Sequence, residues 1–298
     1  MNNFFKTAAA LIIFTRAVAI FPAYSQTDLR MSIGKLIATV DGEIGVGIRH
    51  LERGDTLSVS GDDHFPMQSV FKFHLALAVL HEVDEGRLSL DQEVLVKKQD
   101  YISNTWSPIA AKHPEGNIYL TIRDLISYTV ASSDNNGCDV LFGLLGGPDK
   151  VNAFIVGLGI NDIAIKNTER EMHQSWDLQF KNWTTPVAMV NILDMYYKGQ
   201  VLAPKTTAFL RKTLEETITG NNRIKGLLPV GTTVAHKTGM GERNGVIGAV
   251  NDVGVITLPN GHHVSIALFI TKTSESVPTL EKLMAEISRS VFDYYSRG

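Results

Sequence analysis

Ser69 and Lys72 form the pair of residues in this sequence whose types and spacing most directly suggest chemistry. They lie in Pro66–Lys72, where an apolar run begins that predicts a helix ending near Gly86. Helical spacing places both side chains on one face, one turn apart. A serine becomes a good nucleophile when a neighbour takes its proton, and a lysine can do so when burial or other cations disfavour its charge. The pair indicates acyl transfer, although a lone Ser-x-x-Lys is most often a solvated helix face.

Two more motifs supply polar groups that could assist acyl transfer. Ser133-Asp134-Asn135 follows a helix expected to end near residue 130, so Ser133 can pass a proton to a leaving nitrogen and Asn135 can hold a substrate carbonyl. The alternative is a turn or helix cap. Lys237-Thr238-Gly239 lies on an expected strand, where the first two can bind a carboxylate and Gly239 permits close approach. The alternative is protective charge on an edge strand.

Glu169 and Arg223 are two further candidates. Glu169 lies in a polar, irregular segment between residues 159 and 183, and a carboxylate held beside an ester can activate water. A segment this long without a regular pattern is usually functional or mobile. Arg223 can help to neutralise an anionic substrate. Solvated surface charges are the alternative for both residues.

The set and order of these motifs resemble the class A serine β-lactamases, from about residue 27 to residue 295. The resemblance implies that Ser69 attacks a β-lactam carbonyl while Lys72, or Glu169 through a water, takes its proton. It further implies that Ser133 protonates the lactam nitrogen and that Glu169 activates the deacylating water. The N–H groups of Ser69 and Met240 would stabilise the oxyanion, and Lys237, Thr238 and Arg223 would hold the substrate carboxylate. No metal or other cofactor is implied.

Four segments resemble the PER- and VEB-type branch of that family and its Bacteroidetes relatives: 65–69, 106–109, Glu169 with 172–173, and 251–255. That branch is associated with extended-spectrum cephalosporin hydrolysis, and the likeness adds Trp106 and His173 to the expected substrate-binding residues. Most class A enzymes have asparagine where this chain, like the branch, has His173, so an imidazole would help to hold the deacylating water. Met240 replaces the Ser, Thr or Ala of many relatives, which removes a helpful hydroxyl.

Composition limits the other functions. The 298 residues are 44% hydrophobic and 20% charged, with a formal net charge of −3 and no basic tract, so nucleic-acid binding has no electrostatic support. The single cysteine, Cys138, excludes an intramolecular disulfide and is expected to be buried. Residues 1–25 resemble a signal peptide cleaved near Ser25, which predicts a periplasmic protein without stable membrane association. We expect a monomer that acts on small β-lactam molecules. His262 and His263 are expected to be exposed on a turn.

The periodicity predicts an α+β fold like that of serine β-lactamases and DD-peptidases, with a five-stranded antiparallel sheet flanked by helices. Residues 26–64 and 216–298 would form a discontinuous α/β domain, and residues 65–215 an inserted all-helical domain with an active-site loop at about 160–183. Helices are expected at 27–40, 121–130, 139–145, 185–197 and 278–295, and strands at 44–49, 56–60, 232–238, 251–258 and 264–270.

Three other functions fit parts of the pattern. A penicillin-binding D-Ala-D-Ala carboxypeptidase or transpeptidase shares the Ser-x-x-Lys chemistry, but it deacylates β-lactams slowly and does not require Glu169. A non-hydrolytic β-lactam-sensing module would need a transmembrane segment, and the sequence shows no second apolar span. A generic esterase lacks support because no Gly-x-Ser-x-Gly nucleophile elbow is recognisable.

Overall fold

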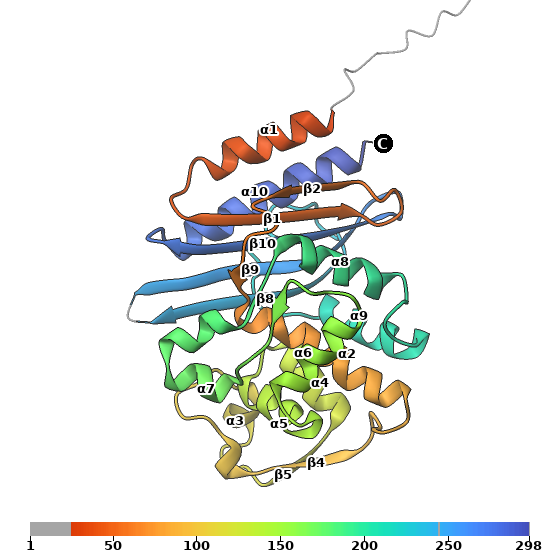
Figure 1. The fold of residues 1–298 in the computed structure, drawn as a ribbon, viewed down its shortest axis with the longest axis vertical. Coiled ribbons are helices and arrows are strands. Elements are labelled where there is room, and N and C mark those ends of the chain that lie inside the picture. The colour runs from red at the N-terminus through yellow and green to blue at the C-terminus, as the bar shows by residue number, and fades with distance from the viewer. Residues whose placement is uncertain (1–24, 244, 298) are drawn as a thin grey trace, which may run out of the picture.

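A five-stranded antiparallel sheet forms one layer of the protein, seen in a computed structural model that describes residues 25–243 and 245–297. Its order is β2-β1-β10-β9-β8, so the two ends of the chain combine in one sheet, as predicted (Figure 1). The strands are β1 (Glu43–His50), β2 (Thr56–Val59), β8 (Val234–Arg243), β9 (Val246–Thr257) and β10 (His263–Thr273). The expected signal peptide, residues 1–25, lies almost entirely outside the described residues.

Helices cover both faces of this sheet. On the outer face, α1 (Gln26–Ile37) and α10 (Val277–Tyr295) pack side by side over an apolar cluster that includes Leu29, Ile266 and Met284 (Figure 1). On the inner face, α8 (Pro186–Tyr197) contacts β1 and β10. A second apolar cluster continues from there into the helical region.

The helical region surrounds α2 (Phe71–Asp84), whose residues 71–80 are all buried. A helix buried on every side needs apolar residues all round, and the sequence supplies them. The other helices are α3 (Pro108–Lys112), α4 (Ile122–Ala131), α5 (Asn135–Leu145), α6 (Pro148–Gly157), α7 (Glu169–Gln174) and α9 (Pro204–Glu215), with 3-10 turns η1 (Gln68–Val70), η2 (Lys98–Asp100) and η3 (Trp176–Lys181). Short strands pair as β3 (Phe65–Pro66), β7 (Trp183–Thr184) and β6 (Ile163–Ala164), and as β4 (Glu93–Val96) with β5 (Ile118–Thr121). We propose the predicted domain boundaries, near residues 64 and 216, because the chain leaves the large sheet at Val59 and rejoins it at Val234, with the helical region in between.

The segment expected to be irregular, 159–183, contains short elements instead: β6, α7, η3 and the start of β7. Pieces of two to six residues are too short to give a readable period. Asn182 holds the segment together because its buried side chain accepts from the N–H groups of Lys166 and Asn167 and donates to the Asn167 carbonyl. These hydrogen bonds hold the two ends of segment 159–183 together.

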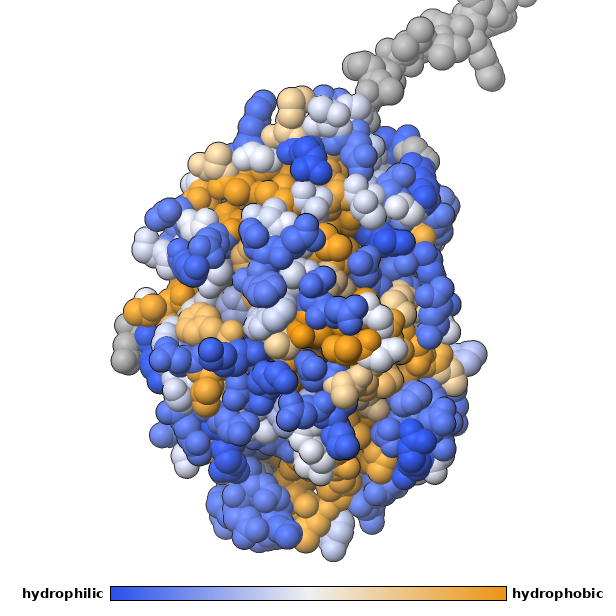
Figure 2. Space-filling view, viewed as in Figure 1, coloured by the Kyte–Doolittle hydropathy of each residue, from blue (hydrophilic) through white to orange (hydrophobic). Residues whose placement is uncertain are grey.

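No single helix within 25–243 and 245–297 is long and apolar enough to cross a membrane. Among these residues, only α5 and α6 taken together reach that length and hydropathy, and the helix axis bends by 72° at the break between them. Figure 2 shows polar side chains over most of the visible face, with apolar residues between them.

His74, on α2, makes stability depend on pH. The side chain is fully buried, and burial lowers its pKa from 6.5 to about 3. A histidine whose pKa is lowered by folding contributes stability above pH 6.5, and that contribution is lost as pH falls from 6.5 toward 3, because only the unfolded chain takes up the proton. Between pH 7 and pH 5, the wild type is expected to lose about 2 kcal/mol of unfolding free energy relative to His74→Gln.

Urea unfolding of the wild type and of His74→Gln at pH 7 and pH 5 measures this loss. Subtracting the two free energies of unfolding removes the contributions of titratable groups that both proteins contain. The shared Asp139, for example, works in the opposite direction, since its raised pKa favours the folded state at low pH. An unchanged difference between the proteins at pH 7 and pH 5 would show that His74 does not titrate as described.

Candidate active site

Lys72 is the centre of a polar cluster between the sheet and the helical region. Its Nζ lies 3.0 Å from Ser69 Oγ, 2.9 Å from the Ser133 carbonyl oxygen and 2.9 Å from Glu169 Oε1, and it also donates to Asn135 Oδ1. The side chain is completely buried. An ammonium has three N–H groups and cannot donate to four oxygens at once. The contact with Ser69 is thus a place where a proton can pass between the two groups.

Ser69 lies in η1, the 3-10 turn directly before α2, rather than in the regular helix that we expected. Gln68 beside it has a φ of +49°, a conformation that costs non-glycine residues roughly 1 kcal/mol or more. Two contacts hold this turn: the Asn251 amide donates to the carbonyls of Pro66 and Met67, and Gln68 donates to Gln179. The surrounding structure therefore fixes the position of the serine.

Strand β8 runs directly against the Ser69 turn. A Cβ added to Gly239 would lie 2.5 Å from the Met67 carbonyl oxygen and 3.3 Å from the Ser69 nitrogen, so only glycine allows this approach. Gly239 was expected to let a ligand approach closely, and the backbone that approaches it in this structure is the protein's own. This packing also brings the backbone of Met240, the next residue, close to Ser69.

Ser133 and Lys237 form the other side of the cluster. Lys237 Nζ donates to Ser133 Oγ at 2.9 Å and to the Thr238 carbonyl at 3.0 Å. Burial, followed by the charge of Lys72, lowers the pKa of Lys237 well below its ordinary value. Ser133 has a φ of +57°, and its carbonyl accepts from Lys72. Ser133 therefore contacts both buried lysines, Lys237 through its hydroxyl and Lys72 through its carbonyl.

The cap interpretation of the Ser133-Asp134-Asn135 motif is confirmed for Asp134, whereas the catalytic interpretation of Ser133 and Asn135 stays a prediction. Asp134 is the N-cap of α5, and it accepts from the N–H groups of Gly137 and Ile109. Ser133 and Asn135, on either side of it, contact the two lysines, and Asn135 also donates to Thr105 Oγ1. The capping aspartate thus orients its two polar neighbours.

Glu169 is the first residue of α7, and its side chain is largely buried. The Asp139 carboxylate, on α5, accepts from the backbone N–H groups of Glu169 at 2.8 Å and Arg170 at 3.0 Å. Burial, and then the charge of Glu169, raises the pKa of Asp139 to about 6. Nothing in the sequence around Asp139 marked it as the group that holds the start of α7.

A cleft of about 300 Å³ lies beside the cluster, and Trp106 and Thr238 are not part of its lining. Its lining includes Asn135, Glu169, His173 and Met240. The Thr238 hydroxyl is 2.6 Å from that of Thr219. Trp106 is 59% exposed, and its indole N–H donates to the Ser132 carbonyl.

Arg223 is not the surface arginine considered as its alternative. It is 5% exposed, and it donates to the carbonyls of Gly239 and Asn251 and pairs with Glu281. These contacts hold β8 to β9 directly beside the cluster. The periodicity around residue 223 did not predict that the guanidinium is buried.

Sequence reasoning also missed a buried pair behind Lys237. His236 Nδ1 lies 2.9 Å from Asp252 Oδ1, and both side chains are fully buried. Asp252 also accepts the N–H of Ile224. Alternation along β8 points His236 and Lys237 to opposite faces of the sheet, so the pair lies on the face away from the cluster.

Comparison with known proteins identifies the family. The model of the β-lactamase enzyme family matches residues 28–295. The chain is 44% identical to β-lactamase VEB-1 of Pseudomonas aeruginosa over 96% of each protein, and 37% identical to the extended-spectrum β-lactamase PER-1 of the same organism over 89% of this chain and 87% of PER-1. The crystal structure of a β-lactamase from Chitinophaga pinensis superposes with a TM-score of 0.88 at 43% identity, over 89% of this chain and 98% of that one. The chain belongs to the β-lactamase enzyme family, as a class A enzyme similar to VEB-1 and PER-1.

Proposed function

We propose that this β-lactamase opens penicillins and cephalosporins through an acyl-enzyme on Ser69, which a water activated by Glu169 then hydrolyses. The observation that carries the proposal is the position of Lys72, whose Nζ contacts both Ser69 Oγ and the Glu169 carboxylate. Ser69, the nucleophile of the first step, and Glu169, the base of the second, thus both contact one buried lysine side chain. Resistance to β-lactam antibiotics is the biological consequence.

In the acylation step, Ser69 Oγ bonds to the lactam carbonyl carbon and loses its proton to Lys72, or to Glu169 through a water. The carbon–nitrogen bond then breaks, and the nitrogen takes a proton from Ser133 Oγ. Lys237 supports this transfer because it contacts that hydroxyl at 2.9 Å and its pKa is lowered. The N–H groups of Ser69 and Met240 stabilise the oxyanion, and each such donor is worth roughly 10²–10³ in rate.

In the deacylation step, water adds to the ester carbonyl while Glu169 takes its proton, and Ser69 leaves with a proton restored. General-base catalysis of this kind contributes roughly 10²–10⁴ in rate. The buried contacts of Glu169 with Lys72 and of its backbone with Asp139 support a fixed base. His173 lines the same cleft and is proposed to help hold the water.

Lys237, Thr238 and Arg223 are the proposed partners of the substrate carboxylate, with Asn135 on the substrate carbonyl and Trp106 at the rim. Arg223 contributes mainly through its charge, since its N–H groups already bond to backbone carbonyls and Glu281. The similarity to the extended-spectrum enzyme PER-1 supports a leaning toward cephalosporins. We further propose a monomer that acts in the periplasm after a signal peptide near residues 1–25 is removed.

A chromogenic cephalosporin tests this function directly. We expect many turnovers per enzyme molecule and no persistent adduct, because Glu169 clears the ester. A D-Ala-D-Ala carboxypeptidase or a β-lactam-sensing module would instead release about one equivalent of chromophore and stop. Such a stoichiometric burst, with an adduct in the intact-protein mass, would overturn the proposal.

A further inference from the structure

A buried pair of side chains, His236 on β8 and Asp252 on β9, lies behind Lys237 and takes no part in the proposed chemistry. His236 Nδ1 lies 2.9 Å from Asp252 Oδ1 and 3.1 Å from Oδ2, and both side chains are fully buried. Gly254 is paired with His236 across the two strands, and a Cβ added to this glycine would lie 2.6 Å from the His236 Cβ. Glycine at this position therefore leaves room for the ring. Burying a carboxylate costs free energy unless it is hydrogen-bonded, so each contact of Asp252 is informative.

The hydrogen bonds of Asp252 connect the sheet to the segment that precedes β8. With its proton on Nδ1, the His236 ring donates to the carboxylate and fixes the orientation of that group. Asp252 Oδ2 also accepts the backbone N–H of Ile224 at 3.2 Å. The Ile224 side chain is itself fully buried, in the apolar cluster under α1 and α10. The carboxylate therefore fixes the backbone at residue 224.

The residue directly before Ile224 is Arg223, so the same contact fixes the backbone from which the arginine side chain extends. The Arg223 guanidinium donates to the carbonyl of Gly239 at 3.2 Å and to that of Asn251 at 2.9 Å. Asn251 is the residue directly before Asp252 on β9. Asp252 and its neighbour thus hold Arg223 at both ends, one at the backbone and the other at the guanidinium.

The segment that carries Arg223 depends on individual contacts for its position. Residues 216–233, all of which the structure describes, contain no helix or strand. The Arg223 N–H donates to the Gly220 carbonyl and the Gly226 N–H donates to the Arg223 carbonyl, both at 2.9 Å and both inside the segment. These bonds shape the turn, whereas the bond from Ile224 to Asp252 ties its backbone to the sheet. Irregular segments move more readily when such ties are lost.

We propose that Asp252, oriented by His236, is a positioning residue for Arg223 and so for the binding of the substrate carboxylate. The inference rests on the proposed function, in which the Arg223 charge helps to neutralise that carboxylate. The Asp252 contact holds the guanidinium where its charge acts on the substrate. The pair therefore sets how strongly the enzyme prefers an anionic β-lactam over an uncharged one.

A second route from Asp252 to the substrate runs through charge. Burial, followed by the charge of Lys72, lowers the pKa of Lys237, and the negative charge of Asp252 acts in the opposite direction. Asp252→Asn separates the two routes, because it removes the charge and keeps a side-chain oxygen that can accept the Ile224 N–H. Asp252→Ala removes both the charge and the oxygen.

A penicillin and its methyl ester, which lacks the anionic carboxylate, test the proposal by steady-state kinetics on the full enzyme. For Asp252→Ala, we expect KM for the acid to rise about tenfold while kcat stays within about twofold, because a contact made equally in the ground state and the transition state is weakened. The kcat/KM for the ester should stay within about twofold of the wild type, since no carboxylate is bound. Asp252→Asn should lie within about threefold of the wild type for both substrates, because it keeps the acceptor.

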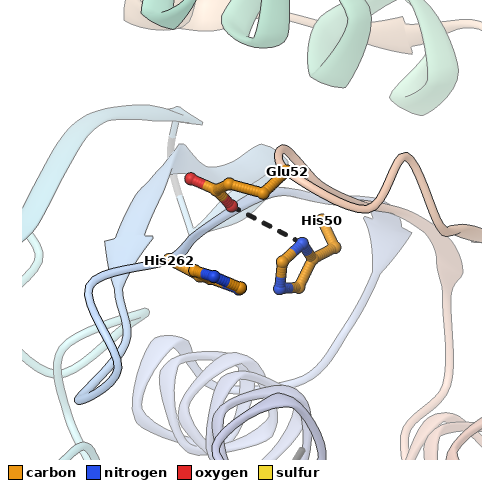
Figure 3. Close-up of side chains that lie close together, drawn as sticks. All are labelled: His50, Glu52 and His262. Carbon is orange, nitrogen blue, oxygen red and sulfur yellow. Dashed lines mark ion pairs between the residues drawn. The ribbon is translucent and has the colours of Figure 1, made fainter.

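His50→Ala is the matched control, because His50 is also a fully buried histidine on the sheet and lies beside a carboxylate. Its Nδ1 accepts the Arg53 N–H at 3.1 Å and lies 3.5 Å from Glu52 Oε2 (Figure 3). Two strands, β10 and β9, lie between the strand of His50 and that of His236. The ratio of kcat/KM for the acid to kcat/KM for the ester should therefore stay that of the wild type in this variant.

The surroundings of His50 also correct one expectation. His262 and His263 were expected to be exposed on a turn, but both are partly buried. The ring centroids of His262 and His50 are 5.2 Å apart (Figure 3), and His263 Nδ1 lies 2.8 Å from Glu52 Oε1. His50→Ala thus shows what the loss of a packed, buried histidine does to turnover when Arg223 is not involved.

Two results in a folded Asp252→Ala protein would refute the proposal: equal losses for the acid and the ester, or no loss for either. Equal losses in Asp252→Asn and Asp252→Ala would also refute it, because they would assign the effect to charge. If Asp252→Ala does not fold, His236→Ala decides, since it keeps the Asp252 oxygens and removes the ring that orients them. It should lower the ratio of acid to ester kcat/KM about threefold, and an unchanged ratio would refute the proposal. A wild type that does not turn over the penicillin would contradict the proposed function instead.

Discussion

Replacing Glu169 with alanine is expected to convert the enzyme into one that acylates once and then stops. The substitution removes the base that activates water but leaves Ser69, Lys72 and Ser133 in place. We expect kcat to fall by roughly 10²–10⁴, with an acyl adduct that persists after a penicillin pulse. Intact-protein mass spectrometry detects the adduct directly.

Lys72 makes the same variant informative about acylation. In the wild type, its Nζ pairs with Glu169 and also contacts the Ser133 carbonyl and the Asn135 amide oxygen. Rapid-quench measurement of adduct formation then separates the two possible bases. An unchanged rate assigns the Ser69 proton to Lys72, and a large fall assigns it to Glu169 through a water.

Two glutamate-to-glutamine substitutions in the same short helix, at Glu169 and Glu171, control for changes in the loop. Glu171 belongs to the same helix, but its carboxylate accepts from the Thr168 N–H and hydroxyl in a capping box, a role that glutamine can also fill. We therefore expect Glu169→Gln to trap the adduct and Glu171→Gln to turn over like the wild type. Free enzyme with continued turnover in Glu169→Ala would remove Glu169 from the mechanism.

Replacing Ser69 with alanine is expected to have the largest effect on activity. Within residues 25–243 and 245–297, Ser69 has the one hydroxyl that contacts Lys72 Nζ, since Ser133 contacts it through its carbonyl. Loss of a nucleophile that acts as one unit with its base typically lowers kcat/KM by roughly 10⁵-fold or more. Hydrolysis of a chromogenic cephalosporin measures the loss, and mass spectrometry should find no adduct.

Ser132→Ala is the control for this second variant, because it removes a nearby hydroxyl and keeps the carbonyl that accepts from Trp106. It should retain near-wild-type turnover. The melting temperature of Ser69→Ala should stay close to that of the wild type, since the Asn251 and Gln68 contacts that hold the turn remain. Activity above a few per cent in a folded Ser69→Ala protein would point to another nucleophile.

The sequence was most informative where the chemistry depends on local spacing. Ser69 and Lys72 are three residues apart, so one turn of backbone brings their side chains into contact, and the distance of 3.0 Å follows. The five strands and the first and last helices were likewise predicted, because apolar residues recur in each at the regular spacing of its secondary structure. The fold class followed from this periodicity, and the family and the activity were implied by the resemblance of the whole motif set to class A β-lactamases; all three are confirmed by the comparisons.

What could not be predicted depends on contacts between distant residues. Asp139 holds the start of α7, Gln179 bonds to Gln68, and Arg223 is buried against two carbonyls, and none of these residues has a local pattern that announces its partner. Glu169 was expected on an irregular loop because α7 is only six residues long. The roles of the individual site residues stay predictions until the variants are measured.

The central position of β10 has a consequence for how the molecule forms. β10 lies between β1 and β9 in the sheet, yet it is the last strand in the chain, and Glu43 pairs with Thr271. Closing so long a loop is entropically costly and slows folding. The two halves of the sheet cannot join until nearly the whole polypeptide has been synthesised. The strand order therefore predicts slow folding, in which the complete sheet forms last.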